Sequence, residues 1–315
     1  MIEPLHLGLI GWPLGHSLSP QLHAAALHGC SLRGEYRLYP IPPAPEENGA
    51  IQELLLKVRR GDLHGLNVTI PHKQAVIPLL DELTLVAQAV GAVNTIYFRD
   101  GRLVGDNTDA PGFLADLERW LASIRQATLP ADQEQQLPFS YALVLGAGGA
   151  ARAVVYALTQ SDCQVYLAAR RLEEAGDLAI SVQRSTFSDQ QSSIEDQQSK
   201  ILVLPLESAS LASLLDKLNS TPLLIVNTTP AGMVPNVESS PWPAEVSLPR
   251  NTAVYDLVYN PPETTLVRTA RAAGLPATTG LGMLIEQAAL SFECWTGLSA
   301  PREAMWQAAG RMSNG

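Results

Sequence analysis

Cysteine is scarce in this chain, and the spacing of the cysteines argues against both disulfide bonds and a zinc site. The 315 residues include only three cysteines, Cys30, Cys163 and Cys294, which lie far apart. No Cys-x-x-Cys pair or mixed Cys/His ligand spacing occurs, which argues against both a disulfide framework and a zinc site. We therefore expect no metal and a reducing, cytoplasmic environment.

Basic residues are outnumbered, with 21 Lys and Arg against 31 Asp and Glu and a formal net charge of -10. Nucleic acids and anionic membranes select for clustered Lys and Arg. We therefore expect neither as a partner. Any anionic ligand must be held by local positive groups and not by a global field.

Long apolar runs are also missing. No stretch approaches the roughly 18 consecutive apolar residues that suggest a membrane span, and the N-terminus carries Glu3 without the basic region of a signal peptide. We expect a soluble protein. Its length exceeds the roughly 250 to 300 residues at which single cores stop growing, so two domains are the default expectation.

The first third of the chain alternates strand and helix patterns. Strands are predicted at 5–10, 35–41 and 65–70, helices at 20–28, 50–59 and 77–90, and a hairpin at 92–99 and 102–105 around Asp100-Gly101. Ser19 before Pro20 suits a helix N-cap. This alternation predicts a largely parallel sheet with any antiparallel strand at an edge.

The pattern restarts after a polar stretch at 127–140, which is the best candidate linker. A helix at 112–124 precedes this stretch. The elements predicted after it are strands at 141–145, 164–169, 201–205, 222–227 and 253–258, and helices at 151–159, 173–182, 282–295 and 301–312. Residues 181–200 are almost wholly polar and are expected to lie on the surface or to be disordered.

A glycine-rich turn follows the strand at 141–145 and opens the next helix. Its residues are Gly146, Ala147, Gly148, Gly149 and Ala150. Glycines allow the backbone to approach a pyrophosphate, whose charge is met by the N–H groups at the helix start. The pattern favours a dinucleotide cofactor; the alternative is a plain strand-to-helix turn.

The end of the following strand favours NADP over NAD. An NAD site normally places an acidic residue about 20 residues after the turn, but this strand ends in Ala169, Arg170 and Arg171. Arginine pairs bidentately with phosphate, so two guanidiniums suit the 2′-phosphate of NADP. The alternative is a pair of solvated arginines at a helix start.

Lys73 and Asp109 each end a polar segment that follows a strand-like run. If they meet in space, they form a proton-transfer pair. Lys73 could instead be a solvated loop lysine, and Asp109 could cap the helix that follows it.

Several short segments occur together in a specific order. They are SLSP at 17–20, NVTIPHK at 67–73, GAVNT at 91–95, GDNTD at 105–109, the Gly146 turn, YDLVY at 255–259, and GLGML at 280–284 with Gln287. With these segments the chain resembles the shikimate dehydrogenase family over most of its length.

The resemblance implies two α/β domains with a cleft between them. An N-terminal substrate-binding domain would cover 1–112 and be joined by C-terminal helices at 283–315, and a Rossmann-like NADP-binding domain would cover 113–282. It implies reversible NADPH-dependent reduction of 3-dehydroshikimate to shikimate, in aromatic amino acid (chorismate) biosynthesis. A monomer and a homodimer are both compatible with the sequence.

The resemblance also assigns residues. Lys73 and Asp109 match the catalytic pair. Residues that match substrate-binding positions are Ser17, Ser19, Thr69, Asn94, Tyr259 and Gln287. Residues that match the cofactor site are Gly146, Ala147, Gly148, Gly149, Ala150, Ala169, Arg170, Arg171, Leu257 and Gly280. Asn94 could instead satisfy a turn, and Gln287 could be an ordinary helix-face residue.

Two residues depart from the family pattern. Ala110 replaces a glycine, and Ala169 replaces an asparagine, for which Arg171 could compensate. A quinate/shikimate dehydrogenase and a non-catalytic NADP-binding sensor remain alternatives. A quinate/shikimate dehydrogenase could prefer NAD, and the pair Arg170 and Arg171 argues against that preference. A non-catalytic sensor has no reason to retain both Lys73 and Asp109.

Overall fold

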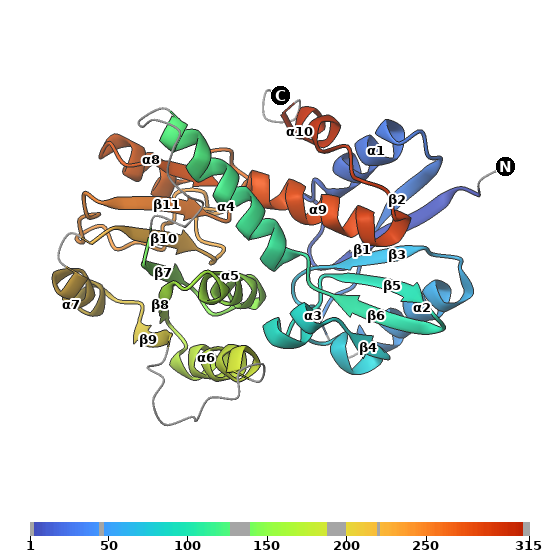
Figure 1. The fold of residues 1–315 in the computed structure, drawn as a ribbon, viewed down its shortest axis with the longest axis horizontal. Coiled ribbons are helices and arrows are strands. Elements are labelled where there is room, and N and C mark those ends of the chain that lie inside the picture. The colour runs from blue at the N-terminus through green and yellow to red at the C-terminus, as the bar shows by residue number, and fades with distance from the viewer. Residues whose placement is uncertain (1–2, 44–46, 127–138, 188–199, 219–220, 311–315) are drawn as a thin grey trace. The chain divides into compact units, whose positions relative to one another are not determined.

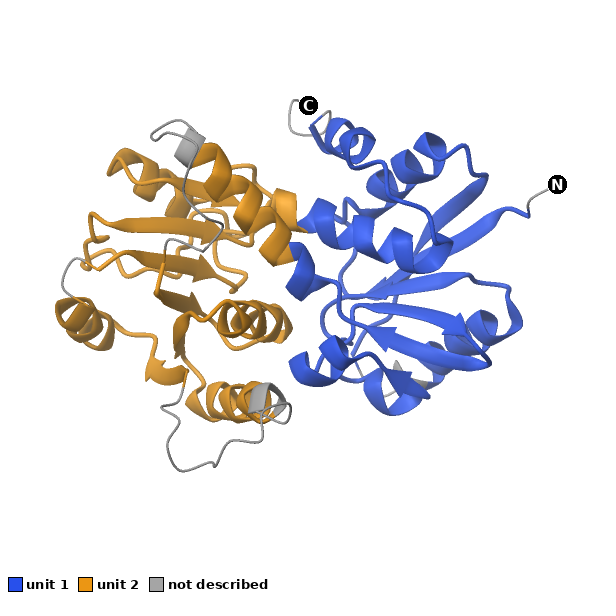
Figure 2. Ribbon diagram, in the orientation of Figure 1, with its two compact units in different colours: residues 1–112, 284–315 blue, residues 113–283 orange. Residues whose placement is uncertain are grey.

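A computed structural model describes residues 3–43, 47–126, 139–187, 200–218 and 221–310. The chain divides into two compact units, which Figure 2 shows in separate colours. The first unit combines Met1–Gly112 with Leu284–Gly315, and the second is Phe113–Met283. Helix α4 (Asp109–Gln126) carries the chain into the second unit, and α9 (Leu281–Thr296) carries it back.

A six-stranded sheet forms the centre of the first unit, in the order β2-β1-β3-β5-β6-β4 (Figure 1). Its strands are β1 (Leu5–Gly11), β2 (Gly34–Pro40), β3 (Gly65–Val68), β4 (Glu82–Leu83), β5 (Thr95–Arg99) and β6 (Arg102–Asp106). β5 is antiparallel to β3 and β6, and the other pairs are parallel. The prediction of a largely parallel sheet is confirmed, but the antiparallel strand is internal and does not lie at an edge.

The predicted hairpin is confirmed as β5 and β6. Its turn residues Asp100 and Gly101 have φ of 51° and 81°, as a tight two-residue hairpin turn requires.

Helices cover both faces of this sheet. The helical elements are α1 (Ser19–Gly29), α2 (Glu47–Arg60), the 3₁₀ turn η1 (Ile77–Leu79), α3 (Leu85–Val90) and α10 (Arg302–Gly310), together with α9. Ile51, Leu54 and Val58 of α2 pack against strand residues such as Ile96 in one apolar cluster. On the opposite face α9 packs closely, since any side chain added at Gly65 would meet the Trp295 ring.

Two local predictions in this unit are wrong. The expected helix at 77–90 is broken into η1, β4 and α3, because Asp81 exchanges hydrogen bonds with the Leu103 backbone and draws the segment to the sheet edge. Ser19 is not an N-cap: it is the first residue of α1, and its N–H donates to Ser17 Oγ over 3.3 Å.

The second unit contains a fully parallel sheet in the order β12-β11-β10-β7-β8-β9. Its elements are β7 (Tyr141–Leu145), α5 (Gly149–Gln160), β8 (Gln164–Ala169), α6 (Leu172–Phe187), β9 (Ile201–Pro205), α7 (Ser208–Leu218), β10 (Leu223–Asn227), β11 (Thr252–Asp256), α8 (Thr265–Ala272) and β12 (Ala277–Thr279). The strand order reverses direction between β7 and β10. In such sheets ligands bind at the carboxyl ends of the strands at this switch point.

Three elements of this unit, α7, α8 and β12, were not predicted from the sequence. α6 also continues to Phe187, beyond the predicted end at 182, and buries Val182, so residues 181–187 are helical and not disordered. Residues 188–199, and most of the predicted linker at 127–140, lie outside the described residues.

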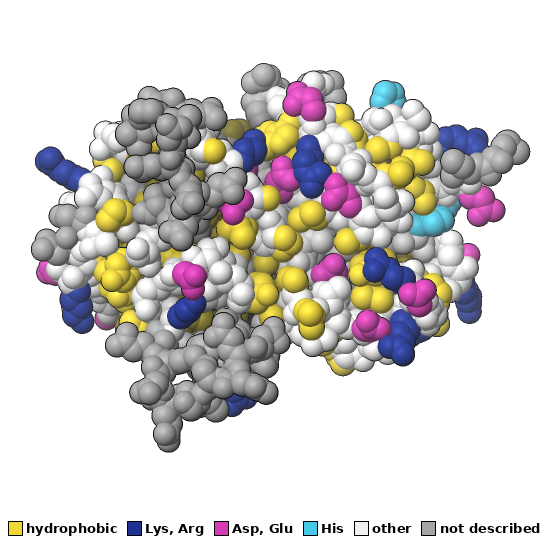
Figure 3. All heavy atoms as spheres, in the orientation of Figure 1, with side chains coloured by type: hydrophobic (Ala, Val, Ile, Leu, Met, Phe, Trp, Pro, Cys, Tyr) yellow, Lys and Arg dark blue, Asp and Glu magenta, His cyan; other side chains and the backbone are white. Residues whose placement is uncertain are grey.

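Charges of both signs are interspersed on the described surface in Figure 3, where Lys and Arg side chains lie beside Asp and Glu. Within the described ranges, no helix has both the length and the apolar character needed to cross a membrane.

Candidate active site

Lys73 and Asp109 meet in the first unit. Lys73 Nζ donates to Asp109 Oδ2 over 2.5 Å, and the two side chains are only 14% and 7% exposed. Lys73 lies in the loop after β3, and Asp109 is the first residue of α4, directly after β6. Lys73 is therefore a half-enclosed ammonium held by a buried carboxylate, not a solvated loop lysine.

The Lys73 loop is anchored on both sides. The imidazole of the buried His72 contacts the carbonyl oxygen of Ile41 over 2.7 Å, and the Val93 N–H donates to the Lys73 carbonyl over 2.8 Å. These bonds fix the lysine backbone, so the ammonium reaches Asp109 from a defined position.

Asn94 holds the second oxygen of the carboxylate. Its Nδ2 donates to Asp109 Oδ1 over 2.9 Å and lies 3.4 Å from Gln287 Oε1. The start of α4 is held by another residue, since Asn107 Oδ1 accepts from the Ala110 N–H over 3.1 Å. Asp109 is thus left to bind Lys73 and Asn94.

Four of the predicted substrate residues form two hydrogen-bonded groups within the first unit. Asn94 and Gln287 adjoin the Lys73–Asp109 pair, and Ser17 and Ser19 sit at the start of α1. Thr69 follows β3, and its side chain leaves no room for a side chain at Gly11, at the end of β1. Tyr259 belongs to the second unit.

A buried polar chain connects these groups. Ser19 hydrogen-bonds Tyr36, whose hydroxyl donates to Asn67 Oδ1 over 2.8 Å. Burial raises the pKa of Tyr36, so its phenol stays protonated and remains a donor. Asn67 Nδ2 in turn donates to the Asn94 carbonyl over 3.1 Å.

Asn67 Nδ2 also lies 3.3 Å from Thr95 Oγ1 and 3.0 Å from Ser291 Oγ, and Ser291 Oγ lies 3.1 Å from Thr108 Oγ1. The sequence patterns gave no role to several residues of this extended chain. They are Tyr36, Asn67, Thr95, Thr108 and Ser291, and all but Tyr36 are buried. One sequence signal was available, because Ser291 follows Gln287 by four residues and so shares its face of α9.

The turn after β7 fits a pyrophosphate. Gly146 has φ of 105°, and a side chain there would meet Thr228 and Thr229 at 2.9 and 2.8 Å. Gly148 is the N-cap of α5, makes no side-chain capping bond, and has open space around it. The N–H groups at Gly149 and Ala150 therefore begin a helix without a side-chain cap, which is a ready anion site.

The two arginines after Ala169 differ in their environment. Arg171 pairs with Glu174 of α6 at 2.5 Å, whereas Arg170 forms no ion pair with the described residues. Both are exposed. A 2′-phosphate would therefore meet one available guanidinium and one shared with a carboxylate.

The loop after β11 carries Leu257 and Tyr259, and a buried carboxylate holds it. Asp256 accepts from Asn227 Nδ2, the Val258 N–H and Thr264 Oγ1 at 2.8, 3.0 and 2.7 Å. Burial raises the pKa of Asp256 to about 6, although the three hydrogen bonds that it accepts act to lower this pKa. Gly280 is pressed against this loop, since a side chain there would lie 2.2 Å from the Leu257 carbonyl.

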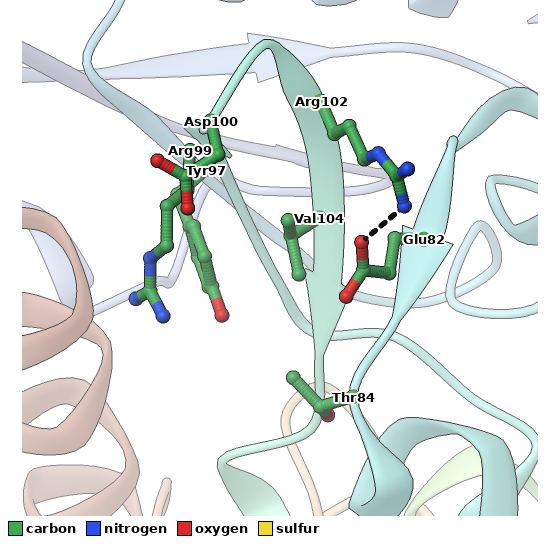
Figure 4. A pocket seen from close by; sticks show the side chains of 7 residues that line it. All are labelled: Glu82, Thr84, Tyr97, Arg99, Asp100, Arg102 and Val104. Atoms are coloured by element: carbon green, nitrogen blue, oxygen red, sulfur yellow. Dashed lines mark hydrogen bonds and ion pairs between the residues drawn. The ribbon is translucent and has the colours of Figure 1, made fainter.

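A surface pocket of about 330 Å³ lies elsewhere in the first unit (Figure 4). Its lining residues are Glu82, Thr84, Tyr97, Arg99, Asp100, Arg102 and Val104. Arg102 is paired with Glu82, and the Arg99 guanidinium lies over the Tyr97 ring. None of the predicted site residues lines this pocket.

The described residues contain no group of three or more His, Cys, Asp and Glu that could hold a metal ion. The three cysteines are free.

Comparison with known proteins decides the family. The chain is 38% identical over 298 residues to the shikimate dehydrogenase (NADP(+)) of Shouchella clausii, covering 95% of both chains. The chain belongs to the shikimate dehydrogenase family. Family models named shikimate dehydrogenase substrate binding domain and shikimate 5′-dehydrogenase C-terminal domain match residues 9–96 and 280–309.

Solved structures of this family have the same fold. The shikimate 5-dehydrogenase of Thermus thermophilus in complex with NADP(H) and shikimate is 36% identical, with a TM-score of 0.74 and coverage of 98% of this chain and 99% of that one. The quinate dehydrogenase of Corynebacterium glutamicum in complex with NAD is 28% identical, with a TM-score of 0.80 and coverage of 98% and 99%. The fold thus serves two related substrates within this group of enzymes.

Proposed function

We propose that this member of the shikimate dehydrogenase family catalyses the reversible NADPH-dependent reduction of 3-dehydroshikimate to shikimate. The observation that carries the proposal is the enclosed ion pair of Lys73 and Asp109, with Asn94 and Gln287 beside it. The chain belongs to a family of dehydrogenases, whose reaction requires a proton transfer that this pair can perform.

Lys73 acts as the proton donor in the direction of reduction. NADPH, when bound, supplies a hydride to the carbonyl carbon. The oxygen then gains negative charge, which is costly unless a proton arrives with it, and the Lys73 ammonium delivers that proton. In the reverse direction the neutral amine takes the hydroxyl proton.

Asp109 keeps the lysine in place. Its Oδ2 binds the ammonium while Asn94 occupies Oδ1, so the carboxylate has a fixed orientation. Charge-assisted bonds of this kind are about twice as strong as neutral ones. Asp109 is therefore an orienting carboxylate within the catalytic pair.

The polyhydroxylated ring and its carboxylate are bound by short donors and acceptors. We assign this role to Ser17, Ser19, Thr69, Asn94, Tyr259 and Gln287. Hydroxyl and amide groups suit such a ligand because a site built to hydrogen-bond hydroxyls rejects analogues that lack them.

NADP is bound in the second unit. We assign the pyrophosphate to the turn Gly146, Ala147, Gly148, Gly149 and Ala150, the 2′-phosphate end to Ala169, Arg170 and Arg171, and the nicotinamide end to Leu257 and Gly280. Two observations support this assignment: α5 starts without a side-chain cap, and Arg170 has no ion-pair partner among the described residues.

The deciding experiment compares initial rates for shikimate and quinate with NADP⁺ and NAD⁺, read as absorbance of the reduced nicotinamide. We expect the highest kcat/KM for shikimate with NADP⁺. Higher kcat/KM for quinate would replace the proposal with a quinate dehydrogenase, to which the Corynebacterium neighbour gives a precedent. NADP⁺ binding without turnover of either substrate would indicate a sensor.

We place the reaction in aromatic amino acid (chorismate) biosynthesis in the cytoplasm, with the enzyme as a monomer or a homodimer. Deletion of the gene in its host should create a requirement for aromatic amino acids, and light scattering should give a mass of one or two chains. Growth without the supplement would contradict the biosynthetic role.

A further inference from the structure

Ser291 lies at the centre of a buried hydroxyl cluster beside the catalytic pair. Its Oγ is 2.7 Å from Thr95 Oγ1, 3.1 Å from Thr108 Oγ1, 3.0 Å from Asn67 Nδ2 and 2.9 Å from the Gln287 carbonyl. The side chains of Ser291, Thr95 and Thr108 are at most 3% exposed. This serine therefore joins α9 to β3, β5 and the segment that precedes α4.

Such a hub is demanding for one hydroxyl. A serine offers one proton and two lone pairs, so its four polar contacts exceed the three hydrogen bonds that it can make at one time. A helical serine commonly bonds only the carbonyl one turn earlier. Because the cluster is buried, a partner that loses Ser291 cannot be satisfied by bulk water, and an unsatisfied buried group is costly.

The orientation of the Asn94 amide is fixed by two groups of known character. The Thr108 N–H can only donate, and it lies 2.8 Å from Asn94 Oδ1. Asp109 accepts from Lys73 Nζ through Oδ2, and its Oδ1 lies 2.9 Å from Asn94 Nδ2. The amide nitrogen must therefore face Asp109.

Thr95 and Thr108 complete the environment of that amide. Thr95 Oγ1 donates to Asn94 Oδ1 over 3.0 Å, and Asn94 Nδ2 donates to Thr108 Oγ1 over 2.9 Å. Both threonine hydroxyls also contact Ser291. The path from Ser291 to the Asp109 carboxylate thus runs through one threonine and then through Asn94, and every step is a buried hydrogen bond.

We propose that Ser291 is a positioning residue for the proton-transfer pair. By holding the hydroxyls of Thr95 and Thr108, it keeps the Asn94 amide turned toward Asp109, and Asp109 in turn presents Oδ2 to Lys73. The inference rests on the proposed roles of Lys73 and Asp109. It adds a residue from the C-terminal helix to the machinery of the reaction.

The first test is the pH profile of kcat in Ser291→Ala. The Asn94 bond stabilises the charged form of Asp109, so its weakening makes the pair hold its proton more tightly. We expect kcat to fall about tenfold, the equivalent of roughly one buried hydrogen bond, and the acidic limb of the profile to move to higher pH. An unshifted profile with kcat within about twofold of wild type would overturn the proposal.

A matched control exists on the same helix. Thr296 Oγ1 lies 2.8 Å from the carbonyl oxygen one turn earlier, at Phe292, just as Ser291 Oγ lies 2.9 Å from that of Gln287. Thr296 Oγ1 also accepts from the Leu298 N–H, outside the cluster. Thr296→Ala should leave the pH profile of kcat unchanged. Equal shifts in both variants would assign the effect to the helix, and the proposal would be wrong.

Thr95→Val provides a second variant of nearly unchanged shape. It removes the hydroxyl that links Ser291 to Asn94, so it should shift the profile in the same direction. In the double variant Thr95→Val/Ser291→Ala, the fold-decrease in kcat should be smaller than the product of the fold-decreases in the two single variants, because both residues act through the same hydrogen-bonded path. If the fold-decreases in kcat simply multiplied in the double variant, the two residues would act independently and the proposed path would be wrong.

A readout that does not need turnover separates this proposal from the proposed function. The side-chain amide protons of Asn94, assigned by their loss in Asn94→Asp, should exchange with solvent about tenfold faster in Ser291→Ala than in wild type or Thr296→Ala, as expected for the loss of roughly one buried hydrogen bond. A wild-type protein inactive on shikimate would refute the proposed function and leave this measurement intact. Unchanged exchange would refute the positioning role.

Discussion

Lys73 depends on one carboxylate oxygen for its position, and that oxygen is free because Asn94 takes the other. Under the proposed mechanism this contact holds the Lys73 ammonium in place, because a proton donor must lie within hydrogen-bond reach of the substrate oxygen that it serves. The role of the pair is therefore testable at a single side chain.

Lys73→Ala should lower kcat for shikimate oxidation by about 100-fold or more, the typical loss when an acid/base group is removed. Lys57→Ala is the control, because Lys57 pairs on the surface with Glu53 and should retain full activity. Steady-state kinetics measure both. An unaltered kcat in Lys73→Ala would remove the residue from the mechanism.

Asp256 predicts a pH dependence of stability. Burial raises its pKa from 3.8 to about 6 in the folded protein, so between these values the folded state binds more protons than the unfolded state. Its contribution to the free energy of unfolding therefore falls as pH rises through this window. Two pKa units correspond to roughly 3 kcal/mol.

Asp256→Asn removes this titration while preserving the shape of the side chain. The variant's free energy of unfolding, minus that of wild type, should increase as pH rises from about 4 to about 6 and stay constant above. Urea denaturation across this range measures the difference. A difference independent of pH would contradict the raised pKa.

At the scale of elements, the end of β8 makes the two arginines unequal. Arg171 is shared with Glu174, and Arg170 has no such partner among the described residues. A phosphate contact through charged hydrogen bonds contributes about 1.5–3 kcal/mol. The two residues, which the sequence presents as an equivalent pair, should therefore contribute differently.

Arg170→Gln should raise KM for NADP⁺ by about tenfold or more and change KM for NAD⁺ little, because NAD⁺ lacks the 2′-phosphate. Arg171→Gln should have a smaller effect on NADP⁺. Comparison of KM for both cofactors in both variants provides the measurement. Equal changes for NADP⁺ and NAD⁺ would refute the 2′-phosphate assignment.

Several apolar strands were predictable from the sequence, but the amphipathic helix α8, with Leu266, Val267 and Ala270 buried, was missed. β7, β8 and β9 have the predicted bounds because each is a continuous apolar run between turn residues. Residues 77–90 were misread because the bonds of Asp81 to the Leu103 backbone, which are made across the sheet, override local helical periodicity. Long-range pairing of this kind leaves no local signal.

The same limit applies to the candidate site. Lys73 and Asp109 stand out in sequence because each follows a strand, where loops present functional groups. Ser291 and Tyr36 do not, since each contacts Asn67 from a distant part of the chain. Their relation to Asn67 exists only in the folded chain.

At the scale of the whole molecule, the proposed NADP residues belong to the second compact unit, and all proposed substrate residues except Tyr259 belong to the first. NADP⁺ alone should protect amides near the Gly146 turn and the end of β8 from hydrogen exchange, in the second unit. Shikimate alone should protect residues around 67–73, 94 and 109, in the first. Mass spectrometry of exchange tests this, and protection by NADP⁺ confined to the first unit would contradict the assignment.

The first unit has a consequence for how the protein is made, because it is assembled from both ends of the chain. The ribosome releases Lys73 and Asp109 early, but the helix that carries Gln287 and Ser291 emerges only after the entire second unit has been translated. The neighbours of the proposed catalytic pair are thus incomplete throughout most of synthesis. A nascent chain stalled before α9 would carry both members of the proposed pair and still lack the surroundings that hold them.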